Sequence, residues 1–394
     1  MIFRVVNEER MNQVADLWDY CFEKKDDPFF QYYFSEYCGK NNMVIGGFEE
    51  VDKWERLRCM VHVNPYMLRI RGRRELIPYL VGVATAPEAR GRHLFRPLLE
   101  TAFEVLRAQD FSFVTLMPIY AGIYLPYEFS YCYFRRGYRM DMKQLHPGSA
   151  GSGLTAERVP LDAVLLAPLY EKLTAGMNGV PVRTAFQWDK LLTVHKAEGV
   201  LCAAVYENGG PAGYMLYKID GGCFTVIELL AAGYAARCRL LQYAAQHKSE
   251  ARSFVWLAEQ WDMTYLDFAD QSLSGTAEPF MMARCINVRK ALADLTVPED
   301  MPKGSLVLLL TDSVIGRNNH LLKLKTAPGK LEALSTAGEE EVTMDMGAFT
   351  QLYFGAFSAA ELQEAGRIRC ADPQKLALLD RLLPKCRNYI NEYF

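Results

Sequence analysis

A short arginine-rich loop is the part of the sequence best suited to chemistry. An apolar run over Leu80–Thr85 predicts a buried strand, and an amphipathic pattern predicts a helix from about Gly91 to Ala108, with Arg90 and Arg92 at its start. The first turn of such a helix has free backbone N–H groups at the positive end of the helix dipole. Anions bind there, and arginines add charge-assisted hydrogen bonds. The segment therefore indicates an anion site that would suit a diphosphate.

The run from Val83 to Phe95, VATAPEARGRHLF, carries a more specific signal. It resembles the acetyl-CoA signature of the GCN5-related (GNAT) acetyltransferases, in which a strand leads through Q/R-x-x-G-x-G/A into a helix. The resemblance implies that Arg90 takes the first motif position, and that backbone groups of Val83 and Thr85 hold the pantetheine arm and polarise the thioester carbonyl. His93 and Phe95 stand where the motif has small residues. The residues assigned to acetyl-CoA are Val83, Ala84, Thr85, Arg90, Gly91, Arg92, His93, Leu94, Phe95, Arg96, Ile119 and Tyr120.

Tyr124 is the second candidate for a chemical role. Its run, Gly122–Phe129, resembles the GNAT pattern F-Y-x-x-x-G-F, in which the tyrosine is a general acid. The reference pKa of a tyrosine, about 10, keeps it protonated at working pH, so it can donate to a departing thiolate. The chain has 22 tyrosines, and only the position after the acetyl-CoA strand and helix singles out Tyr124. Glu128 replaces the usual glycine.

The elements that must position these residues fall into three segments. At 394 residues the chain is too long for a single core, so two or three domains are expected. The first segment has a helical pattern over 11–22 and strand-like runs over 43–50, 60–70, 75–85 and 113–116. The Gly/Ser/Pro-rich stretch His146–Leu154 has nothing to bury, so it predicts a boundary.

The second segment repeats the order of the first. Its patterns predict helices within 161–195, strands over 200–206, 213–219 and 224–230, a helix over 234–246 and a strand over 253–257. The shared order of helix, hairpin, strand, helix and strand indicates a duplicated fold. Because the loop Ala231–Arg237 lacks the acetyl-CoA motif, we expect this copy to have lost acetyl-CoA binding. The third segment begins near Met281, has α+β patterns and carries no catalytic motif.

The whole chain resembles the Eis (enhanced intracellular survival) acetyltransferases. Besides the two motifs above, the resemblance includes the runs ARCINVRKAL, LYFGAF and RIRCADP, in the same order. It implies an α/β (α+β) fold with two tandem GNAT-like domains and a C-terminal sterol-carrier-like α+β domain. The expected division is a catalytic domain over 1–147, a second GNAT-like domain over 155–280 and the sterol-carrier-like domain over 281–394.

The resemblance also implies a role for Phe394, the final residue of the sequence. In that family the C-terminal carboxylate is the proposed general base of the first domain. A free α-carboxyl has a pKa of about 3.3–3.7 and a primary amine one of about 10, so the carboxylate is a poor base unless burial raises its pKa. It would mainly attract the ammonium and accept a proton late. The alternative is that an apolar C-terminus merely packs.

Small-molecule amines are the substrates that the resemblance implies, as aminoglycosides, polyamines or lysine-type amines. Asp26, Asp27 and Glu392 are candidates for substrate contacts, and the alternative is a solvated turn and a surface acid. No motif pairs Cys132 with a histidine, so we prefer direct transfer in a ternary complex to a covalent route. The resemblance also implies a homo-oligomer, namely a hexamer.

The composition narrows the classes of partner. The net charge is −3, the pI is near 6.1 and the basic residues are scattered, which argues against a nucleic-acid surface. The apolar runs are far shorter than the ~20 residues that span a bilayer, and the N-terminus does not resemble a signal peptide. A cytoplasmic protein without a membrane partner is expected. The ten cysteines lack CxxC spacing and do not cluster with histidines, so we expect reduced thiols and no metal.

Two other functions stay open on the sequence. A lipid-binding or small-molecule-binding protein would use the sterol-carrier-like domain and keep the GNAT domains as a scaffold. The substitutions at His93 and Phe95 favour it. The other is a peptide N-myristoyl or other long-chain acyltransferase, because related double-GNAT enzymes also use C-terminal carboxylates.

Overall fold

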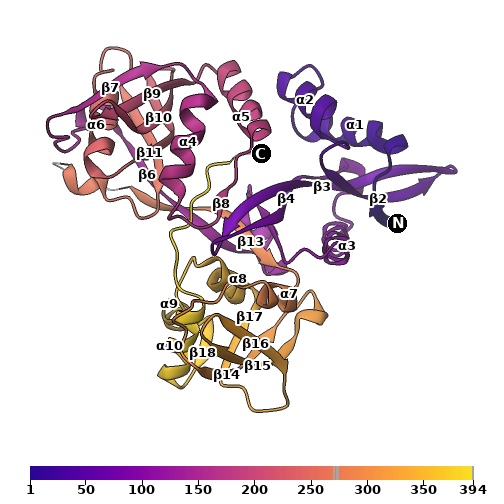
Figure 1. Cartoon of the computed structure of the whole chain (residues 1–394). Coiled ribbons are helices and arrows are strands. Elements are labelled where there is room, and N and C mark those ends of the chain that lie inside the picture. The colour runs from indigo at the N-terminus through magenta and orange to yellow at the C-terminus, as the bar shows by residue number, and fades with distance from the viewer. Residues whose placement is uncertain (269–270, 272–274, 393–394) are drawn as a thin grey trace. The chain divides into compact units, whose positions relative to one another are not determined.

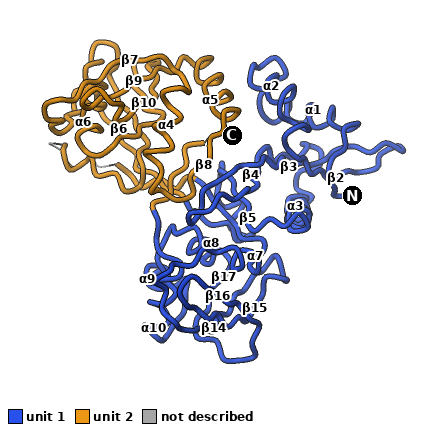
Figure 2. Tube along the Cα trace, in the orientation of Figure 1, with its two compact units in different colours: residues 1–132, 281–386, 394 blue, residues 133–280, 387–393 orange. Residues whose placement is uncertain are grey.

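The computed structural model describes residues 1–268, 271 and 275–392. The chain forms two compact units, each built from stretches that are separated in sequence (Figure 2). The first unit contains Met1–Cys132 and Met281–Cys386, and the second contains Tyr133–Phe280 and the segment that begins at Arg387. None of the helices in the described stretches combines the length and the apolar character that crossing a bilayer requires.

The first unit begins with a sheet that packs against helices on both faces (Figure 1). Its strands pair in the order β1 (Ile2–Val5), β2 (Met43–Val51), β3 (Trp54–Ile70), β4 (Arg73–Thr85), β5 (Phe113–Leu116) and β13 (Thr276–Cys285). β4 and β5 are parallel, and the other neighbours are antiparallel. The helices are α1 (Met11–Cys21), α2 (Pro28–Tyr32) and α3 (Phe95–Ala108). Because side chains alternate across a strand, Met60 of β3 joins the core under α1 and Val61 joins the core under α3.

The helix after the arginine loop begins later than the sequence predicted. α3 starts at Phe95, not near Gly91. Gly91 and His93 have φ values of 73° and 56°, and an α-helix of L-residues does not contain such left-handed backbone. Residues 91–94 therefore form a loop in place of a first helical turn.

A second sheet forms the remainder of the first unit. Its strands pair in the order β16 (Lys330–Ser335), β15 (His320–Ala327), β14 (Gly304–Thr311), β17 (Val342–Asp345) and β18 (Ile368–Cys370). The helices are α7 (Val288–Ala293), α8 (Met346–Phe354), α9 (Ala359–Glu364) and α10 (Pro373–Leu382). The sequence patterns missed β16, β18 and α9, which are short and therefore show little periodicity.

The second unit has the same order of elements as the first sheet. Its strands pair in the order β6 (Ser130–Asp141), β12 (Ser253–Glu259), β11 (Cys223–Ala231), β10 (Gly210–Asp220), β9 (Leu201–Glu207) and β7 (Leu154–Val159). The helices are α4 (Ala163–Thr174), α5 (Ala185–Ala197) and α6 (Tyr234–Ala245), and a two-residue strand, β8 (Val180–Pro181), lies between α4 and α5 in sequence. Two helices, a hairpin, a third strand, a helix and a strand parallel to the third occur in both sheets.

The strands beside β5 and β12 are exchanged along the chain. β6 follows β5 in sequence but pairs antiparallel with β12. The strand beside β5 is β13, whose residues 282–285 pair with residues 113–116. The first unit is therefore discontinuous, because β13, from a distant part of the chain, pairs with β5.

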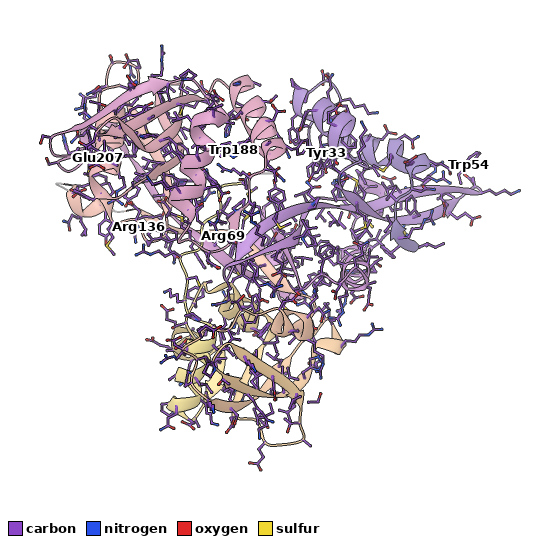
Figure 3. The ribbon with its side chains drawn as sticks, viewed as in Figure 1. Tyr33, Trp54, Arg69, Arg136, Trp188 and Glu207 are labelled. Atoms are coloured by element: carbon purple, nitrogen blue, oxygen red, sulfur yellow. The ribbon has the colours of Figure 1, made fainter. Side chains whose placement is uncertain are left out.

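A buried polar cluster lies in the core of the first unit. His62 of β3 is fully buried, and its Nδ1 lies 2.9 Å from the hydroxyl oxygen of Tyr33, which Figure 3 labels. The Trp18 ring centroid lies 4.9 Å from that of the imidazole, and Nε2 has no hydrogen-bond partner among the described residues. Burial lowers the pKa of His62 to about 3, because a charged imidazolium would lose its hydration. The imidazole is therefore neutral in the folded protein.

The neutral His62 makes the stability of the fold depend on pH. The unfolded chain protonates this imidazole below a pKa of about 6.5, whereas the folded chain does so only near pH 3. The burial of neutral His62 therefore costs no proton-binding free energy above pH ~6.5, and its contribution to stability is complete there. Below that, the free energy of unfolding should fall by about 1.4 kcal/mol per pH unit until the folded pKa is reached. Urea unfolding curves between about pH 7.5 and pH 4.5 measure the slope.

The control for this prediction is a pair of matched substitutions. His62→Gln replaces the imidazole with a hydrogen-bonding amide that does not titrate. It should therefore lower the slope of unfolding free energy against pH by about 1.4 kcal/mol per pH unit. His146→Gln, at an exposed position, should keep the wild-type slope. Equal slopes in His62→Gln and the wild type would assign the pH dependence to another group.

Candidate active site

The site is built where β4 and β5 part. Tyr79 of β4 lies opposite Thr115 of β5, and β4 then continues to Thr85 while β5 ends at Leu116. We call this divergence, β4 residues 80–85 and the end of β5, the first fork. Beyond Tyr79, no parallel strand among the described residues pairs with this side of β4, and an extended ligand that carries amides can pair with such an edge.

A β-bulge changes the direction of β4 within the first fork. The register against β3 shifts between Val81 and Ala84, so Gly82 and Val83 share one partner position. Gly82 has a φ of 55°, and a Cβ there would lie 2.3 Å from the Trp18 ring, so only glycine fits. A bulge leaves its extra residue unpaired in the ladder. The bulge therefore adds an unused backbone position at the strand residues assigned to the thioester.

The loop after β4 is shaped to hold an anion at the start of α3. His93 has a φ of 56°, and Leu94 after it is right-handed, with φ −73° and ψ −17°. Alternating left- and right-handed residues turn successive N–H groups towards one point, where anions bind. Leu94, the N-cap residue of α3, makes no side-chain capping hydrogen bond to the first N–H groups of the helix. His93 thus adopts the conformation that the motif's glycine would have.

The arginines of this loop differ in their partners. Arg92 lies 2.7 Å from a carboxylate oxygen of Glu49 on β2, and its hydrogen bonds hold the pKa of that carboxyl at about 2. Arg96 is paired within α3. Arg90 is exposed, and its Nε lies 3.3 Å from the carbonyl oxygen of Thr85. Arg90 therefore joins the loop to the end of β4 while its guanidinium stays at the surface.

Tyr124 packs against the start of α3. Its ring centroid lies 5.6 Å from that of Phe95 and 5.8 Å from that of Phe129, both in edge-to-face geometry. Phe95, which replaces a small motif residue, thus supplies a packing surface for the tyrosine. Burial raises the pKa of Tyr124, so the hydroxyl is protonated at neutral pH. One aromatic contact brings the arginine loop and the candidate acid together.

Glu128 occupies the position where the motif has glycine. Its backbone is left-handed, with a φ of 60°, a conformation that glycine adopts without strain. The carboxylate accepts hydrogen bonds from the N–H of Ser313 at 2.7 Å and of Met346, the first residue of α8, at 3.2 Å. It also lies 3.9 Å from Arg284, a buried arginine that pairs with Asp312 at 2.8 Å. Glu128 therefore links the turn after Tyr124 to the second sheet of the unit.

The other residues predicted for the site in the first unit are Ile119, Tyr120, Asp26 and Asp27. Ile119 and Tyr120 follow β5 and are 95% and 68% exposed. Asp26 is exposed. The side chain of Asp27 caps α2 by accepting a hydrogen bond from the Phe29 N–H at 2.8 Å, so the fold already uses this carboxylate.

The C-terminal candidates are only partly described. Phe394 lies outside the described residues. Glu392 belongs to the second unit, where it is 9% exposed and accepts a hydrogen bond from Nε of Arg183 at 2.8 Å. It is therefore in a buried ion pair and is not a surface acid. Arg183 and its other partner, Glu228, were not among the residues predicted from the sequence. The one available signal was an acid inside the apolar run FTVIELL of β11, because a carboxylate is seldom buried without a partner.

Family models match each of the three segments. An acetyltransferase (GNAT) domain matches residues 3–132, and a second model with the same description matches residues 179–286. A sterol carrier protein domain matches residues 288–391. These matches confirm the predicted fold of two tandem GNAT domains followed by a sterol-carrier-like domain.

Individual relatives agree with the family models. The N-acetyltransferase Eis of Mycobacterium tuberculosis is 26% identical over 310 residues, which cover 76% of this chain and 75% of the relative. A conserved protein of unknown function from Enterococcus faecalis, a probable N-acyltransferase, has a TM-score of 0.86 at 21% identity and covers 100% of this chain and 99% of its own. A GCN5-related N-acetyltransferase from Anabaena variabilis has a TM-score of 0.82 at 20% identity over 100% of both chains. The two solved structures share the fold. The chain is a GNAT acetyltransferase and a homologue of the Eis N-acetyltransferases.

Proposed function

We propose that this acetyltransferase moves the acetyl group of acetyl-CoA directly to a primary amine in a ternary complex. The observation that carries the proposal is the contact between Phe95 and Tyr124, which joins the anion-binding loop to the candidate acid within one unit. Two reactants held in one site gain rate through orientation, because the encounter no longer has to occur in solution.

The first fork and the loop after it fit acetyl-CoA. The pantetheine arm would pair with backbone groups at the end of β4, and Val83 and Thr85 would orient the acetyl group. The diphosphate would lie at the left-handed turn of His93 and the start of α3, beside the exposed Arg90. The full set that we assign to acetyl-CoA is Val83, Ala84, Thr85, Arg90, Gly91, Arg92, His93, Leu94, Phe95, Arg96, Ile119 and Tyr120.

The transfer needs one proton donor and one proton acceptor. The amine nitrogen attacks the thioester carbon, so that a C–N bond forms and the C–S bond breaks. Tyr124 donates its hydroxyl proton to the departing thiolate and recovers a proton from solvent. The proton of the amine passes to the carboxylate of Phe394, directly or through water. We assign this second role from the family resemblance.

We propose aminoglycosides, polyamines and lysine-type amines as the acceptor class. The Eis relatives are N-acetyltransferases, which supports an amine acceptor. Of the three acidic candidates, Asp26 is exposed, while Asp27 and Glu392 have hydrogen-bond partners in the fold. Asp26 is therefore the one we favour for attracting an ammonium group.

The cytoplasmic location, the hexamer and the division of the chain into domains over 1–147, 155–280 and 281–394 remain predictions from the sequence.

Tyr124→Phe tests the assignment of the acid. The substitution keeps the ring packing on Phe95 and removes only the hydroxyl. It should lower kcat by about 100-fold or more, because general acid catalysis contributes that much, and should leave the acetyl-CoA Kd within about twofold. Thiol release at saturating amine measures kcat, and calorimetry measures the Kd. Tyr127→Phe is the matched control, since that ring packs on the same phenylalanine at 5.1 Å, and it should retain kcat. An unchanged kcat in Tyr124→Phe would refute the role of Tyr124.

Deletion of Phe394 tests the proposed acceptor of the proton. Thiol release from acetyl-CoA is measured against a panel of aminoglycosides, polyamines and lysine derivatives. Amine-dependent release should fall by roughly 100-fold in the deletion variant, whereas acetyl-CoA binding should persist, because the loop and the first fork are intact. Amine-dependent release at the wild-type rate would exclude the carboxylate of Phe394.

The same panel separates the rival functions. No thiol release with any amine, from a folded protein that purifies with bound lipid, would favour the lipid-binding function. Faster turnover with long-chain acyl-CoA than with acetyl-CoA would favour a long-chain acyltransferase. Amine-dependent release that is fastest with acetyl-CoA supports the proposal.

A further inference from the structure

The second unit contains a divergence of strands like that of the first. β11 and β12 pair in parallel up to Val226, which lies opposite Trp256. β11 then continues to Ala231 and β12 to Glu259. We call residues 227–231 and 257–259 the second fork. It is the counterpart of the first fork in element order, because β11 corresponds to β4 and β12 to β5.

The C-terminal segment of the chain lies in the second fork. We call residues 387–392 the tail, and its residues 388–391 line one hollow together with residues 227–229 of β11 and 256–259 of β12. The Asn391 side-chain amide donates to the carbonyl oxygen of Ile227 at 2.9 Å. Arg135 of β6 donates to Oδ1 of the same asparagine at 2.9 Å and to the carbonyl oxygen of Ile390 at 3.1 Å. The first β11 carbonyl beyond the ladder is therefore paired with the tail.

Further hydrogen bonds hold the rest of the tail. The N–H of Tyr389 donates to the carbonyl oxygen of Asn178 at 2.9 Å, and the N–H of Asn178 donates to that of Arg387 at 2.9 Å. The Tyr389 hydroxyl donates to the carboxylate of Glu228 on β11 at 2.7 Å. Tyr389 and Ile390 are 8% and 6% exposed. The backbone of the tail is thus bonded to Asn178, and its side chains are bonded to β11.

A buried ion cluster fixes the far end of the tail. Arg183 uses both terminal nitrogens on Glu228, at 2.9 and 2.8 Å, and its Nε on Glu392 at 2.8 Å. Its guanidinium carbon also lies 4.1 Å from the centre of the Tyr170 ring and 4.8 Å from that of Trp188, which Figure 3 labels. Glu392 therefore accepts from the one guanidinium nitrogen that does not bond to Glu228, and loss of its carboxylate would remove the partner of that buried N–H.

The two forks hold chemically similar partners if the proposed function is right. In the first fork, an amide-bearing arm of acetyl-CoA would pair with the edge of β4. In the second fork, the side-chain amide of Asn391 in the tail pairs with the carbonyl of Ile227 on the equivalent edge of β11. The tail therefore stands where a second acetyl-CoA would otherwise bind, which accounts for a GNAT domain that kept its fork and lost its anion motif.

We propose that the second fork is a docking groove for the chain's own tail, in place of an acyl-CoA, and that Arg183 and Glu392 are positioning residues that fix the end of the chain. The second half of the proposal rests on the proposed function, in which Phe394, two positions beyond Glu392, accepts a proton. The first half does not.

Carboxypeptidase Y digestion of the full chain tests the docking. In the wild type, trimming should slow sharply before it removes Glu392, because the enzyme requires a released, extended end. Glu392→Ala should speed trimming past Tyr389 by about tenfold, and Glu392→Gln should restore part of the protection, because its amide oxygen can still accept from Arg183. Glu364→Ala, at an exposed acid of α9, is the matched control and should match the wild type. The same digestion in urea corrects for residue preference.

Kinetics on the same variants test the positioning. Glu392→Ala should lower kcat with the preferred amine by about tenfold, leave the acetyl-CoA Kd unchanged and recover in Glu392→Gln. Faster trimming together with lower kcat supports both halves. If Glu392→Ala is trimmed faster but the wild type itself turns over no amine, the docking is supported, and the positioning role is rejected along with the proposed function. Unchanged trimming in Glu392→Ala overturns the docking, and a fall in kcat would then assign Glu392 to the substrate site.

Discussion

Two parallel strands that part before they end impose the constraint on which this structure depends. The backbone N–H and C=O groups beyond the last ladder pair still need partners, because a buried unpaired group costs about as much as a lost hydrogen bond. β4 outruns β5 at the first fork and β11 outruns β12 at the second. In the proposed function the edge of the first fork binds acetyl-CoA, whereas in the second fork Asn391 of the tail donates to the carbonyl of Ile227. We propose that the same geometry serves binding in one sheet and anchoring in the other.

Two clusters of buried charges join distant segments of the chain to these sheets. Arg284 pairs with Asp312 and lies near Glu128, while Arg183 pairs with Glu228 and Glu392. Such clusters add little net stability, but breaking one by removing a partner costs roughly 3–5 kcal/mol, because a buried charge is left uncompensated. Each cluster joins residues that lie far apart in the sequence.

The sequence was informative where the signal is local. Periodicity predicted most helices and strands, and the motif around Arg90 identified the loop that Gly91 and His93 shape. Contacts between residues that are far apart in the sequence could not be predicted from it. The sequence around Glu128 does not indicate that its carboxylate binds the N–H groups of Ser313 and Met346. The sequences of the strands likewise do not indicate that β13, and not β6, pairs with β5. The start of α3 was misplaced because a histidine took a left-handed backbone, which the composition of the loop does not encode.

The exchange of strands removes the modularity that three recurring domains would suggest. A fragment that ends in the glycine-rich stretch after Leu145 contains every residue assigned to acetyl-CoA, yet it lacks β13 beside β5. Its sheet would end in an open edge next to the first fork, and such edges invite association with other chains. The second GNAT domain, in turn, needs both β6 and the tail. A GNAT domain cut out at its sequence boundaries would therefore lack part of the structure that completes its sheet.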